Sequence, residues 1–196
     1  LHFAPDVATS SRATIGGMIA NNSCGAHSIV FGRTVDHVAE LTVVLGDGEV
    51  ATFRDDANAS SERGWAIEAE LGLLRDEYAE EIVRRFPKVM RSNGGYGLDR
   101  LGSPARAVEI LCGSEGTLGI VVGAKLRLVR IPRKTGLVVL HFRSVLEALA
   151  ATPLVLRHSP AAVELIDRLI LDAGRSNPAI APMVPKRQSK LLLRHS

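Results

Sequence analysis

The pattern of apolar and polar residues predicts a β-hairpin in the first third of the chain. Residues 38–45 (VAELTVVL) and 49–53 (EVATF) are rich in β-branched residues, which favour strands. The connector Gly46-Asp47-Gly48 joins them, and such a turn between two apolar runs is a strong hairpin signal. We therefore expect two antiparallel strands here.

Short apolar runs predict further strands in the second half of the chain. Residues 107–111 (AVEIL), 118–122 and 124–129 are of this kind. The last run alternates lysine, leucine, arginine and leucine, as a strand with one exposed face does. Residues 137–142 (LVVLHF), which follow a break at Pro132, predict another strand.

Three segments have the spacing of helices. Residues 65–86 end before Pro87, which does not continue a helix, and residues 145–156 and 161–173 predict two more. The expected apolar face of the first helix consists of Trp65, Ala69, Leu73, Tyr78, Ile82 and Phe86. Because strands and helices do not alternate strictly, the predicted fold class is α+β. Residues 131–136 (IPRKTG) predict a linker between two domains.

Composition excludes several classes of protein. The 196 residues carry a net charge of +3 and aromatic residues make up 4%, which argues against a nucleic-acid binder. No apolar run approaches the roughly 18 residues of a membrane helix. Cys24 and Cys112 do not make a disulfide scaffold and favour a reduced, cytoplasmic setting. Peripheral association with a membrane stays open.

The first glycine-rich zone is Thr-Ile-Gly-Gly-Met-Ile-Ala-Asn-Asn-Ser-Cys-Gly at residues 14–25. The paired Gly16 and Gly17 let the backbone approach a flat or anionic ligand, and the polar residues after them add short donors. The alternative is a tight turn followed by an asparagine-rich loop. The glycine spacing fits neither the dinucleotide fingerprint nor a P-loop.

The second glycine-rich zone is Glu-Ile-Leu-Cys-Gly-Ser-Glu-Gly-Thr-Leu-Gly-Ile-Val at residues 109–121. We expect a strand on each side of its glycines. Ser114 does not lie in the Gly-x-Ser-x-Gly pattern of a nucleophilic serine, because Gly113 directly precedes it. A glycine-rich connection between strands, with a surface glutamate, is the alternative to a binding loop.

In combination, the two zones resemble the FAD-binding domain of the vanillyl-alcohol oxidase/PCMH-type flavoproteins. The resemblance rests on ATIGGMIANNSCGAHSIVFGRTVDHVAELTVVLGDGEV and EILCGSEGTLGIV. Residues 86–91 (FPKVMR), 95–100 (GYGLDR) and 163–168 (VELIDR) are similar to the branch that contains D-lactate, glycolate and D-2-hydroxyglutarate dehydrogenases.

The resemblance implies an FAD cofactor and a set of residues that contact it. One group would lie along the flavin and its pyrophosphate or ribityl chain: Thr14, Ile15, Gly16, Gly17, Asn21, Asn22, Ser23 and Gly25. A second group, Glu115, Gly119 and Ile120, would lie near the ribityl and adenosine side. Backbone groups of Gly119 and Ile120 would read the adenine edge.

The resemblance also implies the organisation of the chain. Residues 1–131 would be the C-terminal portion of a PCMH-type FAD-binding domain, and 137–185 the beginning of an α+β substrate domain. Residues 186–196 (KRQSKLLLRHS) do not resemble the family. The family's glycine-rich phosphate-binding loop does not occur in this chain, and the chain has no initial Met. We therefore expect a fragment, ended by a truncation or frameshift, that binds FAD poorly by itself.

The implied reaction is oxidation of a D-2-hydroxy acid to the 2-oxo acid. The reduced flavin would pass its electrons to a cytochrome, a quinone, an electron-transfer flavoprotein or an iron–sulfur domain. We assign no catalytic base. His27 and His37 are interpreted as structural, Cys24 as a small packed thiol rather than a nucleophile, and the cysteine and histidine spacing predicts no metal site. Two alternatives are a non-catalytic remnant without flavin and an unrelated α+β binding module.

Overall fold

The computed structural model describes residues 1–56 and 58–184. The chain divides into two compact units, Leu1–Arg130 and Ile131–Ser196. The division falls at the start of the predicted linker, and the assignment of the two units to an FAD-binding and a substrate domain stays a prediction. The predicted tail, residues 186–196, lies outside the described residues. In the described part of the chain, no helix is long and apolar enough to span a bilayer.

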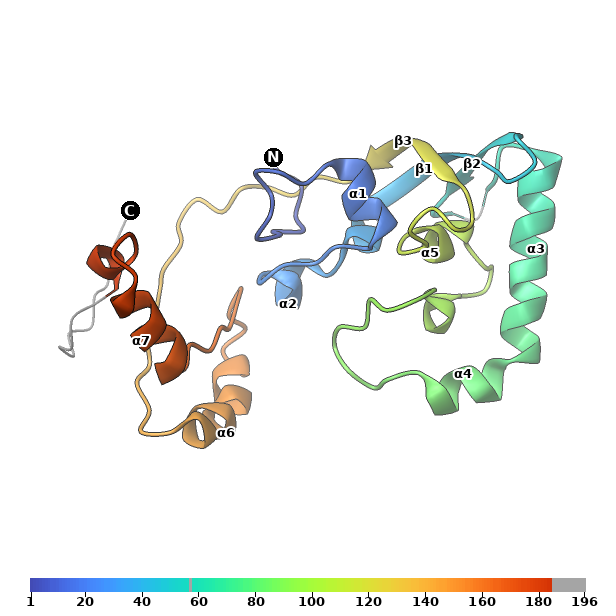
Figure 1. The fold of residues 1–196 in the computed structure, drawn as a ribbon. Helices are drawn as coiled ribbons and strands as arrows, with labels where there is room; N and C mark the ends of the chain where they lie inside the picture. Colours follow the sequence, from blue (N-terminus) through green and yellow to red (C-terminus); the bar gives the residue numbers. More distant parts are fainter. Residues whose placement is uncertain (57, 185–196) are drawn as a thin grey trace. The chain divides into compact units, whose positions relative to one another are not determined.

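Most of the regular structure belongs to the first unit (Figure 1). In chain order its elements are α1 (Ile15–Ala20), α2 (Ser28–Phe31), the 3-10 turn η1 (Thr34–His37), β1 (Val38–Val44), β2 (Val50–Arg54), α3 (Glu62–Glu77), α4 (Ala79–Arg85), η2 (Leu98–Arg100), α5 (Ala107–Leu111) and β3 (Ile120–Leu126). The second unit contains α6 (Val145–Leu156), α7 (Arg168–Ser176) and η3 (Ala181–Met183). This mixture confirms the predicted α+β class.

The centre of the first unit is a three-stranded antiparallel sheet with the order β2-β1-β3. The predicted hairpin is confirmed: Gly48 has φ +86° and donates to the carbonyl of Leu45 at 3.0 Å. One face of the sheet buries Leu41, Val43 and Phe53 completely. Thr42 lies on the other face, where its hydroxyl meets that of Thr52 at 3.2 Å.

The core lies between the buried face of this sheet and the short helices α1 and α5. Its buried members are Ile19, Val35, Val38, Leu41, Val43, Ala51, Phe53, Ala59, Ala107, Val108, Leu111 and Cys112. Burial of these apolar side chains is the main favourable term in folding. Because α1 lies within the first glycine-rich zone and α5 runs into the second, the core also fixes where those zones lie.

Residues 107–111 form helix α5, so their prediction as a strand was wrong. All five side chains are buried, and a five-residue apolar run gives no period that separates a strand from a helix. The first N–H of the helix, on Ala107, donates to the Glu68 carboxylate at 3.3 Å. That contact comes from a distant part of the sequence.

The predicted helix over residues 65–86 is two helices, α3 and α4, which meet at Tyr78. The predicted apolar face was also wrong, because Trp65 and Leu73 are 57% and 69% exposed. The buried positions of α3 are Gly64 and Glu68. The indole N–H of Trp65 donates to the Ala59 carbonyl at 2.7 Å and holds the ring near the surface.

In the second unit, α6 confirms the helix predicted over residues 145–156. The helix predicted over 161–173 begins only at Arg168, where Asp167 caps it by accepting from the Ile170 N–H at 2.8 Å. Residues 137–142 form no strand within the described residues, which corrects that prediction. A strand needs a neighbour to satisfy its backbone, and the apolar side chains of this segment are 43–70% exposed.

We predict that Gly119→Ala destabilises the first unit by about 1–3 kcal/mol, because a side chain there overpacks the core. Its Cβ would lie 2.6 Å from Val43 Cγ1 and 2.9 Å from the Val44 carbonyl oxygen. Gly123→Ala on β3 is the matched control, since its nearest neighbour, Thr42 Cβ, is 3.4 Å away. Urea unfolding followed by circular dichroism measures both. Equal stability of the two variants would contradict this packing argument.

Glu68 makes stability depend on pH. Burial raises the pKa of its carboxyl above 4.5, although hydrogen bonds from the backbones of Ala107 and Ala59 oppose the shift. A raised folded-state pKa means that stability is present at low pH and is lost as pH rises through the folded-state pKa. Glu68→Gln keeps an oxygen for Ala107 and should therefore gain stability over the wild type as pH rises towards neutrality. Unfolding at several pH values, with the exposed Glu70→Gln as control, tests this; a pH-independent difference would refute it.

Candidate functional site

The first glycine-rich zone forms the N-terminus of α1. Thr14 is its cap residue, with extended backbone, and its hydroxyl accepts from the Gly17 N–H at 3.1 Å. The other N–H groups of a first helical turn have no partner within the helix, and Ile15 and Gly16 are exposed. A Cβ placed on Gly16 would meet nothing within 4 Å. The start of α1 therefore exposes backbone N–H donors, with no side chain at Gly16 to cover them.

After α1 the chain turns sharply at Asn22, which has φ +49° and is buried. Its side-chain oxygen accepts from the Val35 N–H at 3.0 Å. Ser23 hydrogen-bonds the exposed Asn21 through its hydroxyl, and its carbonyl accepts from Thr34 Oγ1 at 2.8 Å. The asparagine-rich loop is thus held from inside by Asn22 and has Asn21 on its outer side.

A close backbone approach explains Gly25, the last glycine of the first zone. A Cβ at this position would lie 1.5 Å from the Asp6 carbonyl oxygen. Beside it, His27 Nδ1 and Asp6 Oδ2 are 2.5 Å apart. The ring of His37 is buried, with Nε2 2.6 Å from the Phe31 carbonyl oxygen. Each of the two histidines therefore has a structural contact.

The structure brings the two glycine-rich zones together. The Gly113 N–H donates to the Ile19 carbonyl at 3.0 Å, and the Glu115 N–H donates to the Ala20 carbonyl at 2.9 Å. Positive φ angles at Gly113, Glu115 and Gly116 (93°, 52° and 80°) turn the loop around the end of α1. The exposed Glu115 and Gly116 therefore lie directly beside the first zone.

Gly119 and Ile120 mark the start of β3, at the end of the second zone. Gly119 packs against Val43, whereas the Ile120 side chain is 65% exposed. Helix α1 contacts β3, and the two are side by side in Figure 1. The two zones thus lie next to one another in the first unit, with Ile15, Gly16, Asn21, Glu115 and Ile120 exposed and Asn22 buried.

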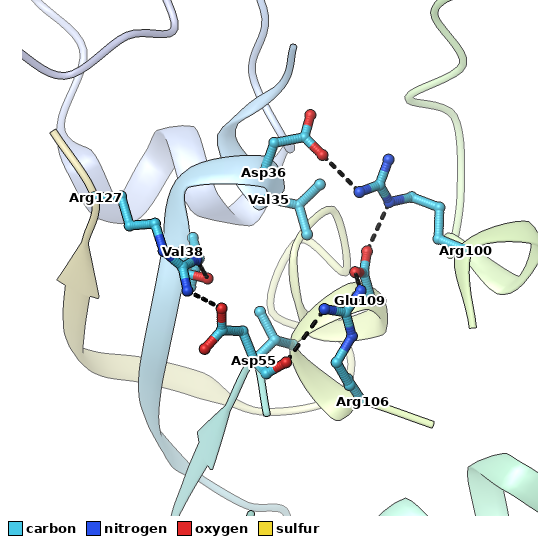
Figure 2. Close-up of a pocket in the computed structure, with 9 residues that line it drawn as sticks. Val35, Asp36, Val38, Asp55, Arg100, Arg106, Glu109 and Arg127 are labelled. Carbon is cyan, nitrogen blue, oxygen red and sulfur yellow. Dashed lines mark hydrogen bonds and ion pairs between the residues drawn. The ribbon is translucent and has the colours of Figure 1, made fainter. Parts of the chain in front are cut away.

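A second candidate site is a charged pocket of about 220 Å³ on the same unit (Figure 2). The buried Glu109 on α5 lies at its centre and accepts from Arg100 Nε at 2.6 Å and from Arg106. Arg100 also donates to Asp36 at 2.6 Å. On the other side, Arg106 donates to the Asp55 carbonyl at 3.2 Å, and the Asp55 carboxylate accepts from Arg127.

These contacts make the charged pocket a structural cluster rather than a ligand site. Each of the three guanidinium groups is paired with a carboxylate, so the pocket offers no net charge to an ion. Burial lowers the pKa of Arg100, but Glu109 and Asp36 outweigh this effect and raise it overall. The chain of charges joins the start of β1, the end of β2, α5 and the residue after β3. No local pattern marks this cluster in the sequence, since its six charged residues come from five separate segments.

The two cysteines differ in their surroundings. Cys112 is buried in the core, and burial raises the pKa of its thiol to about 12. Cys24 is partly buried, and its sulfur accepts from Asn93 Nδ2 at 3.2 Å. Within the described residues, no three histidine, cysteine, aspartate or glutamate side chains are placed to hold a metal ion.

Comparison with known proteins agrees with this geometry. Residues 1–54, which contain the first zone and the hairpin, match the family model described as FAD binding domain. The resemblance to FAD-binding flavoproteins is confirmed. D-2-hydroxyglutarate dehydrogenase of Pseudomonas putida is 36% identical over an aligned length of 181 residues, and the alignment covers 87% of this chain and 18% of the relative. The protein of the same name from Escherichia coli is 30% identical over 186 residues, 89% of this chain and 18% of the relative.

The similarity extends to the other members of the predicted branch. Glycolate oxidase subunit GlcD of Bacillus subtilis is 29% identical over 171 residues, 86% of this chain and 27% of that protein. The chain thus spans under a fifth of the length of the D-2-hydroxyglutarate dehydrogenases it matches. Because the alignments cover 86–89% of the chain, they extend into the second unit.

We predict that Glu109→Gln destabilises the first unit by about 3 kcal/mol, because it leaves two arginines facing a neutral group in a buried cluster. The matched control is Glu40→Gln on the outer face of the sheet, where Glu40 pairs with Arg54 and Lys125. Its loss should be much smaller, since exposed ion pairs contribute little. Urea unfolding at low and high salt compares the two. Similar losses of unfolding free energy in the two variants would mean that burial does not determine how much the Glu109 ion pairs stabilise the unit.

Proposed function

We propose that this chain supplies part of the FAD site of a flavoenzyme that oxidises a D-2-hydroxy acid to the 2-oxo acid. The observation that carries the proposal is the contact between the two glycine-rich zones at the C-terminal end of α1, a helix whose exposed N-terminus lies in the segment that matches an FAD binding domain. The similarity to D-2-hydroxyglutarate and D-lactate dehydrogenases supports the substrate class.

The residues of the junction suit the parts of FAD. The phosphates need N–H donors, which the first turn of α1 offers. In the second zone, the N–H groups of Gly113, Ser114 and Glu115 are already bound to carbonyls of the chain. The flat ring system needs space without side chains, which Gly16 leaves open. The exposed Ile15, Leu118 and Ile120 provide apolar surface beside these donors.

Each predicted residue has a place in the proposal. We assign cofactor contacts at the first zone to Thr14, Ile15, Gly16, Gly17, Asn21, Ser23 and Gly25, and contacts at the second to Glu115, Gly119 and Ile120. Asn22 shapes the loop, because its side-chain oxygen is bound to Val35. When bound, FAD supplies the redox chemistry by accepting a hydride equivalent. The chain's own residues orient the cofactor and exclude water from it.

The proposed partners follow from the reaction class. The substrate is a small D-2-hydroxy acid, and D-2-hydroxyglutarate is the first to test because the most similar relatives named above carry that name. The electrons leave through a cytochrome, a quinone, an electron-transfer flavoprotein or an iron–sulfur domain.

The first experiment adds FAD to the purified chain, removes the excess and records the visible spectrum. Retained flavin bands support the proposal, whereas a folded but colourless chain means that it binds no flavin by itself.

Gly16→Ala separates ligand binding from folding. Among the described residues its Cβ would meet nothing within 4 Å outside its own helix and chain neighbours. Because alanine also favours helix over glycine by about 0.5–1 kcal/mol, we predict unchanged or higher stability. We also predict at least about tenfold weaker FAD binding, since the methyl group occupies the space left for the cofactor. Titration with FAD, followed by flavin fluorescence, measures the affinity.

The control for this variant is Gly72→Ala in α3, where the new Cβ would lie 3.9 Å from Ala105. It makes the same chemical change in a helix of the first unit outside the two glycine-rich zones. We expect it to leave FAD affinity unchanged. Equal FAD affinity of Gly16→Ala and the wild type would show that the cofactor does not approach the N-terminus of α1.

A further inference from the structure

Both glycine-rich zones are contacted by a third segment, Arg91–Gly97 (RSNGGYG), which has no regular secondary structure. Within the described chain, no backbone–backbone hydrogen bond holds residues 91–95. Ordering such a stretch costs conformational entropy, so its side-chain contacts determine its position. We name residues 91–97 the strap.

At one end, the strap is tied to the first zone by Asn93. Its Nδ2 donates to the Asn22 carbonyl at 2.9 Å and to Cys24 Sγ at 3.2 Å. Arg33 donates to the Ser92 carbonyl at 2.5 Å and to Asn93 Oδ1 at 3.5 Å, so both ends of the Asn93 amide are engaged. An amide in this position has a fixed orientation, with its donors towards the loop.

At the other end, the strap is tied to the second zone by Tyr96. Its hydroxyl lies 2.8 Å from Thr117 Oγ1, which itself donates to the Ser114 carbonyl at 2.6 Å. The single hydroxyl proton of Thr117 is therefore used, and Tyr96 is the donor. Between these ties, the strap passes Gly113, where a Cβ would lie 3.7 Å from the Gly95 carbonyl oxygen and 3.3 Å from Asn22 Cβ.

We propose that the strap is a clamp that holds the two glycine-rich zones at a fixed separation, and that Asn93 is its main positioning residue. The consequence for cofactor binding rests on the proposed function, since the zones held in this way are those assigned to FAD. Asn93 does not need to touch the cofactor. It acts by fixing the loop that carries Asn21 and Ser23 relative to the loop that carries Glu115.

The chain contains a probe for the clamp that does not depend on FAD. An aromatic disulfide reagent reacts with accessible thiolates, and Cys112 is buried with a pKa of about 12. Labelling of the native chain therefore reports Cys24, whose sulfur the Asn93 amide covers. Flavin bound across the clamped zones should slow the labelling of Cys24 further.

Asn93→Asp is the sharpest variant, because it keeps the shape and an oxygen for Arg33 but removes both N–H donations. We expect Asn93→Ala to label Cys24 about tenfold faster, the effect of roughly one hydrogen bond on a local opening. Asn93→Asp is not used for labelling, because its carboxylate beside Cys24 Sγ disfavours the reactive thiolate. Asn58→Ala is the control. Asn58 is exposed, and Arg54 contacts its backbone carbonyl, which the substitution keeps. We also expect weaker FAD binding and altered flavin bands at saturating FAD in both Asn93 variants, and wild-type behaviour in Asn58→Ala.

Tyr96→Phe tests the other end of the clamp and keeps the proposal testable if the Asn93 variants do not fold. It removes one exposed hydroxyl, and we expect faster hydrogen exchange at the Gly113 and Glu115 amides, which bind the end of α1. Unchanged exchange in Tyr96→Phe, or wild-type Cys24 labelling in folded Asn93→Ala, overturns the clamp. Wild-type FAD affinity in Asn93→Asp overturns its role in positioning. If the wild type binds no FAD by itself but Asn93→Ala labels faster, the clamp stands without support for the proposed function.

Discussion

The arrangement of the candidate site depends on the left-handed turn at Asn22. A non-glycine residue with positive φ is held there only when its surroundings compensate for the strain, and three segments do so. Its side-chain oxygen accepts from Val35 at the entry to β1, its carbonyl accepts from Asn93, and its Cβ lies against the Gly113 loop. Asparagine suits the position because its short side chain tolerates this conformation and bonds nearby backbone. The turn therefore sets where α1 ends, and with it the position of the second glycine-rich loop.

The charged cluster around Glu109 supports this arrangement from the opposite end of α5. A buried carboxylate is costly unless its oxygens are paired, and both oxygens of Glu109 are bound by arginines. One of these, Arg100, also holds Asp36, whose second oxygen accepts from the Arg33 N–H at 2.7 Å. Arg33 in turn holds the strap through Ser92. The same polar contacts that make the cluster unsuitable as an ion site thus connect α5, the start of β1 and the strap.

Local chemistry determines which elements could be predicted from the sequence. The hairpin was predictable because Gly46-Asp47-Gly48 encodes its turn directly, and α6 because Ser144 accepts from the Glu147 N–H at its start. Helix α5 was misread because its conformation depends on Glu68 and on burial between distant segments. The two glycine-rich zones were recognisable as motifs. Their contact through the Ile19 and Ala20 carbonyls depends on the tertiary structure, so no local sequence pattern predicts it. Asn93 and Arg100 were missed for the same reason, since a single polar residue in a loop has no period or spacing.

The glycines of the two motifs serve different physical purposes, which the motif alone does not separate. Gly25 and Gly119 are required by packing, because a side chain would enter the Asp6 backbone or Val43. Gly113 and Gly116 are required by positive φ angles in the loop. Gly16 is constrained by neither, since it is helical and the space beside it is open within the first unit. Alanine would favour the helix more than glycine does at this position. Because the fold itself does not require Gly16, contact with an external ligand is the explanation that we propose for this residue.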